Sequence, residues 1–162
     1  KGTFIASTEP KSGSGSLAEL ITKVTPITLM RSSLSLEPAI AREAAINASG
    51  DAVSNLTIIG QRTQAADNWE DYELFDDQFH RAIGIAADNP LLLSLFDHLN
   101  AVRRGVAWKT VVRSSVRPAF DHTSFAEHGQ ILAAIEARDP SAAHASMRTH
   151  LVSVSNRLFG DA

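Results

Sequence analysis

Residues 69–83 read Trp-Glu-Asp-Tyr-Glu-Leu-Phe-Asp-Asp-Gln-Phe-His-Arg-Ala-Ile, and this stretch decides how the chain folds. Its large apolar side chains recur at helical spacing and form one stripe, which consists of Trp69, Tyr72, Phe79 and Ile83. At about 100° per residue, Asp76 and His80 lie about 40° apart and inside that stripe. A carboxylate and an imidazole on a buried face are costly unless they are paired or bind a metal. The sequence therefore predicts a helix whose buried face carries an ionisable pair.

The composition is that of one folded domain. The chain has 162 residues, of which 44% are hydrophobic and 20% are charged, enough for a real core. A net charge of −3 argues against this fragment holding a nucleic-acid backbone unaided. The absence of cysteine excludes disulfides and thiolate metal sites. No apolar run approaches a membrane span and no signal peptide opens the chain, so we expect a cytoplasmic protein without a membrane partner.

Helical periodicity extends over most of the remaining chain. The expected helices cover about residues 17–24, 29–48, 51–66, 69–88, 90–114, 120–138 and 140–159. Asp51, Asn68, Asn89 and Asp139 are the expected caps, and Pro38 either opens or kinks the second helix. These patterns predict an all-α antiparallel bundle of about six to seven helices.

The first fifteen residues differ from this bundle. Residues 1–7 have the pattern of a short strand remnant, and residues 8–15 have the composition of a linker. The chain also lacks a starting methionine. We therefore expect a fragment in which residues 16–162 form the helical domain and an upstream domain has been removed.

Two further helices direct a histidine at the interior. His128 and His150 each lie on the apolar stripe of their helix, whereas His122 and His144 lie about 120° away from those stripes. His98 lies on a polar flank. Three helices in one small bundle share one core, so their inward polar groups are expected to meet.

One divalent cation satisfies a carboxylate and three neutral imidazoles together. We therefore predict a metal site formed by Asp76, His80, His128 and His150, with Zn, Ni, Mn or Fe as the ion. The alternative is structural: an interior histidine is often a hydrogen-bonded core residue, and an Asp–His pair one turn apart is often an ion pair. No other carboxylate has an obvious inward position.

Several blocks of the sequence now match a known family. Residues 76–83 and 86–92 resemble its D-x-x-F-H-R-x-(I/L)…A-A-x-N-P-L-L signature, and residues 127–151 resemble its E-H-x-x-I-L-x-A-I…D…A…M-x-x-H-L ending. Residues 36–38 and 44–45 are similar to its L-E-P…A-A opening. The family is the FCD domain, the C-terminal effector-binding and dimerisation domain of GntR-type transcription regulators of the FadR subfamily.

The resemblance covers roughly residues 16–160 and carries several implications. Asp76, His80, His128 and His150 fall on the family's metal ligands. In such domains the metal commonly holds the carboxylate of a small organic acid, the effector, and the domains form homodimers. Residues 1–6 look like the last wing strand of a winged helix, so DNA binding would require an N-terminal domain that is missing here.

The chain departs from the family at one position. Many members carry an arginine four residues before the glutamate of the L-E-P motif, where this chain has Ser33. An arginine that clamps the effector's carboxylate then has to come from elsewhere. Arg103 lies at the centre of the apolar stripe of the predicted 90–114 helix and is the expected effector-binding residue, with Arg104 as second choice. Alternatively, Arg103 pairs with a carboxylate of the bundle or extends to water.

Three functions compete at this point. The leading hypothesis is a sensor domain, in which effector binding shifts the arrangement of two protomers. The second is a metal-dependent hydrolase, which lacks an obvious general base beside the metal, so we expect no enzyme. The third is a helical dimerisation module whose inward polar groups are only structural.

Overall fold

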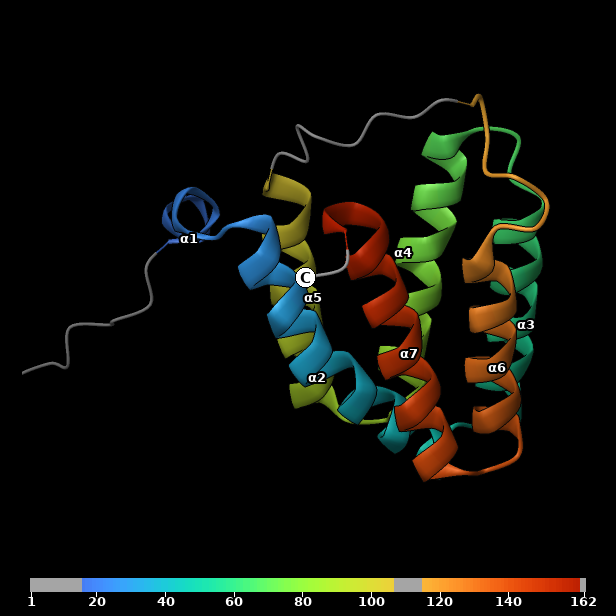
Figure 1. The fold of residues 1–162 in the computed structure, drawn as a ribbon. Coiled ribbons are helices and arrows are strands. Elements are labelled where there is room, and N and C mark those ends of the chain that lie inside the picture. Colours follow the sequence, from blue (N-terminus) through green and yellow to red (C-terminus); the bar gives the residue numbers. More distant parts are fainter. Residues whose placement is uncertain (1–15, 107–114, 161–162) are drawn as a thin grey trace, which may run out of the picture.

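The computed structural model describes residues 16–106 and 115–160 and confirms the all-α class. Within these residues the chain forms seven helices and no strand (Figure 1). They are α1 (Leu17–Lys23), α2 (Pro26–Asn47), α3 (Gly50–Gln64), α4 (Trp69–Ala86), α5 (Pro90–Gly105), α6 (Thr123–Glu136) and α7 (Pro140–Phe159). The expected strand remnant and linker at residues 1–15 lie outside the described residues.

Each of these helices begins after a polar residue whose side chain accepts a backbone N–H of the first turn. The expected caps Asn68, Asn89 and Asp139 are confirmed. The expected cap Asp51 is wrong, because Ser49 caps α3 by accepting the N–H of Ala52. Asp51 instead lies in the first turn, where its charge favours the positive helix end.

Two other expected boundaries shift. The fifth helix was expected to continue to about residue 114, but α5 ends at Gly105, and residues 107–114 lie outside the described part. The sixth begins at Thr123 rather than near Phe120, because the imidazole of His122 accepts the N–H of Ser124 and caps α6 there. Pro38 lies inside α2 rather than at its start.

The same tight turn joins α4 to α5 and α6 to α7. Asp88 and Arg138 adopt φ angles of 49° and 56°, and each precedes a capping residue and a first-turn proline. A non-glycine residue in this left-handed conformation costs roughly 1–2 kcal/mol, which the two helix ends offset with their capping hydrogen bonds. The second turn places α7 directly against α6.

The main core lies between α2, α3, α4, α6 and α7, and α5 contributes Phe96 to it. In Figure 1, α7 lies between α2 and α6 in this view, and its contacts with both confirm that it packs against them. The largest fully buried apolar side chains of this core are Ile40, Leu56, Phe79, Ile83, Phe96, Ile131, Ile135 and Met147. None of the helices in the described ranges is both long and apolar enough to cross a bilayer.

A smaller apolar cluster fastens α1 to the bundle. Leu29, Val102 and Val106 are buried there, and Ile21 of α1 packs against them. A Cβ atom on Gly105 would lie 2.3 Å from the Cδ1 atom of Ile21, so a larger residue at this position would require the Ile21 side chain to move.

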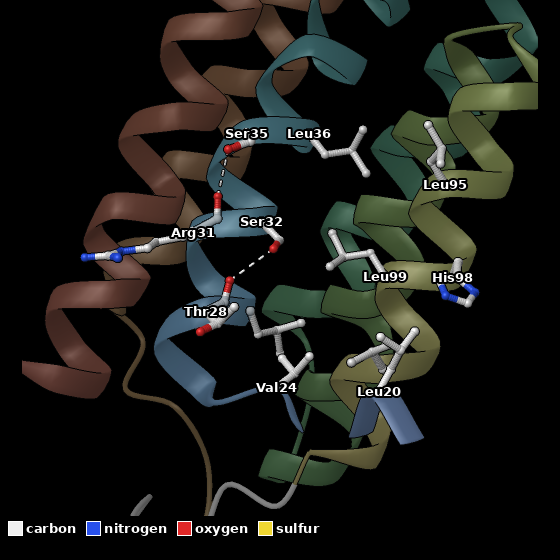
Figure 2. A pocket seen from close by; sticks show the side chains of 12 residues that line it. Leu20, Val24, Thr28, Arg31, Ser32, Ser35, Leu36, Leu95, His98 and Leu99 are labelled. Atoms are coloured by element: carbon white, nitrogen blue, oxygen red, sulfur yellow. Dashed lines mark hydrogen bonds between the residues drawn. The ribbon is translucent and has the colours of Figure 1, made fainter. Parts of the chain in front are cut away.

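Beside this cluster an apolar groove of about 510 Å³ opens between α1, α2 and α5. Figure 2 shows side chains of all three helices pointing into it, among them Leu20, Leu36, Leu95 and Leu99. None of the residues that line it belongs to the predicted metal site.

Candidate metal centre

The structure brings the four predicted side chains together at the centre of the main core. Asp76 and His80 come from α4, His128 from α6 and His150 from α7. One ligand atom of each lies within 4.8 Å of the corresponding atoms of the other three. The three histidines are buried, with at most 4% of each residue exposed, whereas the Asp76 side chain is 27% exposed. The cluster is therefore closed on its histidine side, and Asp76 is its most exposed member.

Two of the imidazoles are fixed by carboxylates. The Nδ1 atom of His80 lies 2.6 Å from Oε2 of Glu37 on α2, and Nδ1 of His150 lies 2.8 Å from Oε2 of Glu127 on α6. An ionised carboxylate only accepts hydrogen bonds, so each Nδ1 is the donor. In a neutral imidazole with its proton on Nδ1, the Nε2 atom carries a free lone pair.

These two Nε2 atoms face each other at 3.2 Å. Two lone pairs at this distance repel unless a proton or a cation lies between them. Two nitrogen ligands about 2.0–2.1 Å from one zinc ion at a tetrahedral angle are about 3.3 Å apart. The observed spacing therefore fits nitrogen ligands that share one metal ion.

His128 is held differently. Its ring stacks on Phe79 with a centroid separation of 4.5 Å and an interplanar angle of 24°. Its Nε2 atom lies 3.2 Å from Oδ1 of Asp76, but without the direction of a hydrogen bond, and neither ring nitrogen has a hydrogen-bond partner. A buried nitrogen without a partner is costly, and a cation between His128 and Asp76 would satisfy it.

The charges of the cluster also suit a cation. Burial acts to raise the pKa of Asp76, but the nearby His128 and His80 rings hold it well below its usual range, so it is ionised. Burial lowers the pKa of His150 to about 4, which keeps this ring neutral. Burial also acts to lower the pKa of His80, but the Glu37 carboxylate outweighs it and raises that pKa, so a proton competes with a metal at this ring. One carboxylate oxygen and three imidazole nitrogens, without sulfur, match the donor preferences of Zn, Ni, Mn or Fe.

The expectation that no other carboxylate faces inward is wrong. Glu37 is only 2% exposed, and Glu127 is mostly buried as well. The signal for Glu37 was present in the sequence, because it shares a helical face with Ile40 and Ala44, both fully buried. Glu127 directly precedes His128 and lies about 100° from it around the helix. It is therefore off the apolar stripe of α6, and the sequence pattern gave no sign that it contacts α7.

Arg103, the expected effector-binding residue, lies close to the cluster and already has partners. Its Nη2 atom donates to Oδ1 of Asp77 at 2.9 Å, and its Nε atom donates to Oδ1 of the buried Asn100 at 3.0 Å. Burial acts to raise the pKa of Glu37, but the contacts with His80 and then the positive charge of Arg103 lower it. Arg104, the second choice, is 65% exposed and lies 3.4 Å from Asp77.

Ser33 is buried one helical turn before Glu37. The position where many FCD domains carry an arginine therefore holds a small neutral side chain inside the bundle. Among the two arginines considered from the sequence, only Arg103 combines partial burial with an influence on the cluster.

An aromatic group, formed by Trp69, Tyr72, His122 and Phe125, packs next to the cluster at the start of α4 and α6. Its ring centroids lie 5.5–5.9 Å apart in edge-to-face and tilted contacts. Burial and then the Asp76 charge raise the pKa of Tyr72, so its hydroxyl stays neutral beside that carboxylate. The indole N–H of Trp69 donates to the carbonyl of Ser115 and fastens the segment that precedes α6.

Comparison with known proteins agrees with this arrangement. A sequence model of the FCD domain matches residues 29–153, which include all four side chains of the cluster. The chain belongs to the FCD domain family. The resemblance noted in the sequence is thereby confirmed.

Curated relatives of this FCD domain include two bacterial regulators. The Uxu operon regulator of Haemophilus influenzae is 30% identical over 139 residues, covering 84% of this chain and 52% of the relative. The HTH-type transcriptional repressor NanR of Klebsiella aerogenes is 32% identical over 127 residues, covering 75% of this chain and 46% of the relative. The chain thus spans about half the length of these relatives. The expectation that this chain is not an enzyme is confirmed by this relationship.

Two solved structures share the fold. Streptococcus agalactiae GntR matches with a TM-score of 0.63 and 24% identity, over 88% of this chain and 61% of that one. E. coli McbR/YncC matches with a TM-score of 0.72 and 19% identity, over 84% of this chain and 66% of that one. These similarities support the FCD-like bundle.

Proposed function

We propose that this FCD domain is the ligand-sensing and dimerisation domain of a cytoplasmic GntR-type transcription regulator of the FadR subfamily. In this proposal Asp76, His80, His128 and His150 hold one divalent metal ion, and a small organic acid binds beside it. DNA binding belongs to an N-terminal winged helix, of which residues 1–15 are the remnant and linker. The names of the two curated relatives, both regulators, support the regulatory role.

The observation that carries the proposal is the convergence of four donor side chains from three helices within 4.8 Å. Three of them are buried imidazoles, which cost free energy unless each ring nitrogen has a partner. A structural cluster would have to satisfy these nitrogens among themselves, yet Nδ1 of His128 has no partner and its Nε2 has only the Asp76 carboxylate, at 3.2 Å and without hydrogen-bond geometry. A shared cation accounts for the whole group.

The neighbourhood of the cluster suits an anionic guest. A bound divalent cation supplies positive charge that attracts a carboxylate. The chain adds the Arg103 guanidinium, which can form paired hydrogen bonds to a second carboxylate or to the same one in place of its present contacts with Asp77 and Asn100. The exposed side of Asp76 provides the route by which a small acid reaches the cluster. Binding regulates the protein only if the two arrangements of its dimer differ in affinity for the acid.

Metal analysis tests the first half of the proposal. Protein purified without chelators should contain about one divalent ion per chain, and chelation should lower its melting temperature. A protein that contains no metal, binds none on addition and loses no stability with a chelator would instead be a structural dimerisation module.

Ligand titration tests the second half. Small carboxylic acids should raise the melting temperature of the metal-loaded protein, whereas the matching amides should not. The shift should disappear after chelation and shrink in Arg103→Gln. Equal shifts with acids and amides would rule out a carboxylate effector, and turnover of carboxylate esters would favour the hydrolase.

A further inference from the structure

We propose that Glu37 and Glu127 are positioning residues of the metal centre. Each carboxylate holds a proton on Nδ1 of one histidine, so that the Nε2 atoms of His80 and His150 face the same ion. This inference rests on the proposed function, because it concerns how two of the proposed ligands are oriented. It assigns a role to two residues that the metal-ligand pattern itself does not include.

The contact between Glu37 and His80 is sealed from water. The two side chains are 3% and 2% exposed, and their 2.6 Å contact joins α2 to α4. Because no water can replace the carboxylate, its loss leaves the Nδ1 proton of His80 without an acceptor. The ring is then free to rotate or to place its proton on Nε2, which removes the lone pair that a metal needs.

The contact between Glu127 and His150 is built similarly but nearer the surface. Glu127 lies on α6 and accepts from Nδ1 of His150 on α7 at 2.8 Å, while its side chain remains 13% exposed. Nη1 of Arg157 lies 3.8 Å from Oε1, the other carboxylate oxygen of Glu127, and its positive charge helps to hold this carboxylate in place. Water can replace part of this contact, so Glu127 should matter less than Glu37.

His128 provides an internal comparison. Its Nδ1 atom has no carboxylate partner and no hydrogen bond, and the ring is held by stacking on Phe79 instead. A change at Glu37 or Glu127 should therefore alter the tautomer of its own histidine and leave that of His128 unchanged. General unfolding or loosening of the core would disturb all three rings together.

Glu37 also extends the centre to a fourth helix. The helix α2 supplies none of the four proposed ligands, yet it packs against both α4 and α7, and Glu37 connects it to His80. Metal binding should therefore reduce hydrogen exchange in the middle of α2 as well as in the ligand helices. Without the carboxylate, zinc that still binds should protect α4 and α7 but no longer the middle of α2.

The experiment compares acceptor and non-acceptor replacements with zinc as the probe. Glu37→Met and Glu127→Met keep a similar side-chain length but cannot accept the Nδ1 proton, whereas Glu37→Gln keeps an acceptor without the charge. We expect Glu37→Met to weaken zinc binding about 10- to 100-fold, as is typical for the loss of such partners, Glu127→Met to weaken it less, and Glu37→Gln to retain most of the affinity. Zinc affinity is measured by competition with a coloured chelator.

Imidazole ¹⁵N NMR of the zinc-loaded proteins reports which ring nitrogen of each histidine carries the proton. If Glu37 and Glu127 only stabilised the fold, their replacement would not change this tautomer. In the wild type, His80 and His150 should carry their proton on Nδ1 and bind zinc through Nε2. Glu37→Met should change His80 alone. Matched controls are Glu43→Gln, the partly exposed partner of Arg42 on α2, and Glu136→Gln, exposed on α6. Both variants should behave like the wild type.

The outcomes separate the two proposals. Zinc binding by both methionine variants within twofold of the wild type, with unchanged tautomers, would overturn the positioning role and leave the metal site standing. A wild-type protein that binds no zinc, nickel, manganese or iron would overturn the metal site and the positioning role together. If Glu37→Met does not fold, Glu37→Gln decides: intact Nδ1 protonation of His80 with largely retained affinity supports the role, and loss of affinity with the tautomer unchanged contradicts it.

Discussion

The buried and outer faces of α4 carry the same kind of pair at the same spacing. Asp76 and His80 face the core; one residue further along, Asp77 is half-buried at the edge of the core and Arg81 is exposed. The outer pair finds protein partners at the surface: Arg81 makes two hydrogen bonds of 2.8 and 2.9 Å to Asp97, and Asp77 binds Arg103. The inner pair meets two further histidines instead.

The difference shows how burial changes the demands on a charged group. Arg81 and Asp97 are each more than 40% exposed, so water solvates them whether or not the pair forms, and the pair contributes little. The inner histidines are not solvated by water, and each of their ring nitrogens that lacks a partner costs free energy. His80 and Arg81 differ by a rotation of about 100° around α4. The buried ring of His80 needs partners inside the protein, whereas the exposed Arg81 does not depend on its contact with Asp97.

Removal of an inner histidine should have the largest effect. His128→Ala or His150→Ala should abolish metal retention and lower the melting temperature of the metal-loaded protein by roughly 10 °C, since an ion at 1,000 times its Kd contributes about 4 kcal/mol. Metal content and thermal unfolding measure both effects. His144→Ala, on the exposed side of α7, should change neither, and equal behaviour of the three variants would contradict the assignment.

The inner cluster should also depend on pH. A metal binds neutral imidazoles, and Glu37 raises the pKa of His80 against the effect of burial, so below that pKa a proton competes with the metal at Nε2. Zinc affinity should therefore fall as the pH is lowered from 8 to 5. His150, with a pKa of about 4, releases no proton on binding in this range. Calorimetry in buffers of different ionisation enthalpy counts the protons released, and a pH-independent affinity would argue against ligation by His80.

The half-buried pair at the boundary of the two faces should have an intermediate effect. Asp77→Asn removes the charged partner of Arg103, whose side chain is 22% exposed, and should destabilise the protein by about 1 kcal/mol. Urea unfolding of the metal-free protein measures it. Zinc affinity should stay within about twofold of the wild type, and a larger loss would place Asp77 among the groups that support the metal.

Loss of the exposed Arg81–Asp97 ion pair should have the smallest effect. Arg81→Gln should cost less than about 1 kcal/mol in dilute buffer, and the loss should fade as added salt screens the charges. Urea unfolding at low and high ionic strength gives the comparison. A loss that persists at 1 M salt would mean that Arg81 contributes through packing rather than charge.

The sequence predicted the helices and the four clustered side chains because both depend on periodicity within single helices. His80, His128 and His150 each lie on an apolar stripe, and stripes in a bundle of this size face one core. Glu37 and Glu127 escaped prediction because their role depends on contacts between helices. Which oxygen reaches Nδ1 of a ring on another helix is set by packing and register, which a single stripe does not specify.

The wrong predictions at the helix ends, the cap of α3 and the start of α6, also have local causes. Ser49 and Asp51 are both good capping residues, and the choice between them depended on where the preceding helix stopped. His122 is an unusual cap, so the start of α6 at Thr123 had no clear mark in the sequence. The long helix that was expected to reach residue 114 ends at Gly105, whereas the strand and linker expected in residues 1–15 stay predictions.

The aromatic group beside the cluster gives this protein a built-in optical reporter. Trp69 lies two helical turns before Asp76, about 10 Å along α4, and contacts Tyr72 directly. The chain has two tryptophans, so Trp108→Phe leaves Trp69 as the single emitter. Its fluorescence should then be quenched when nickel occupies the centre and recover when zinc replaces it, which would let occupancy be followed in real time without any attached dye.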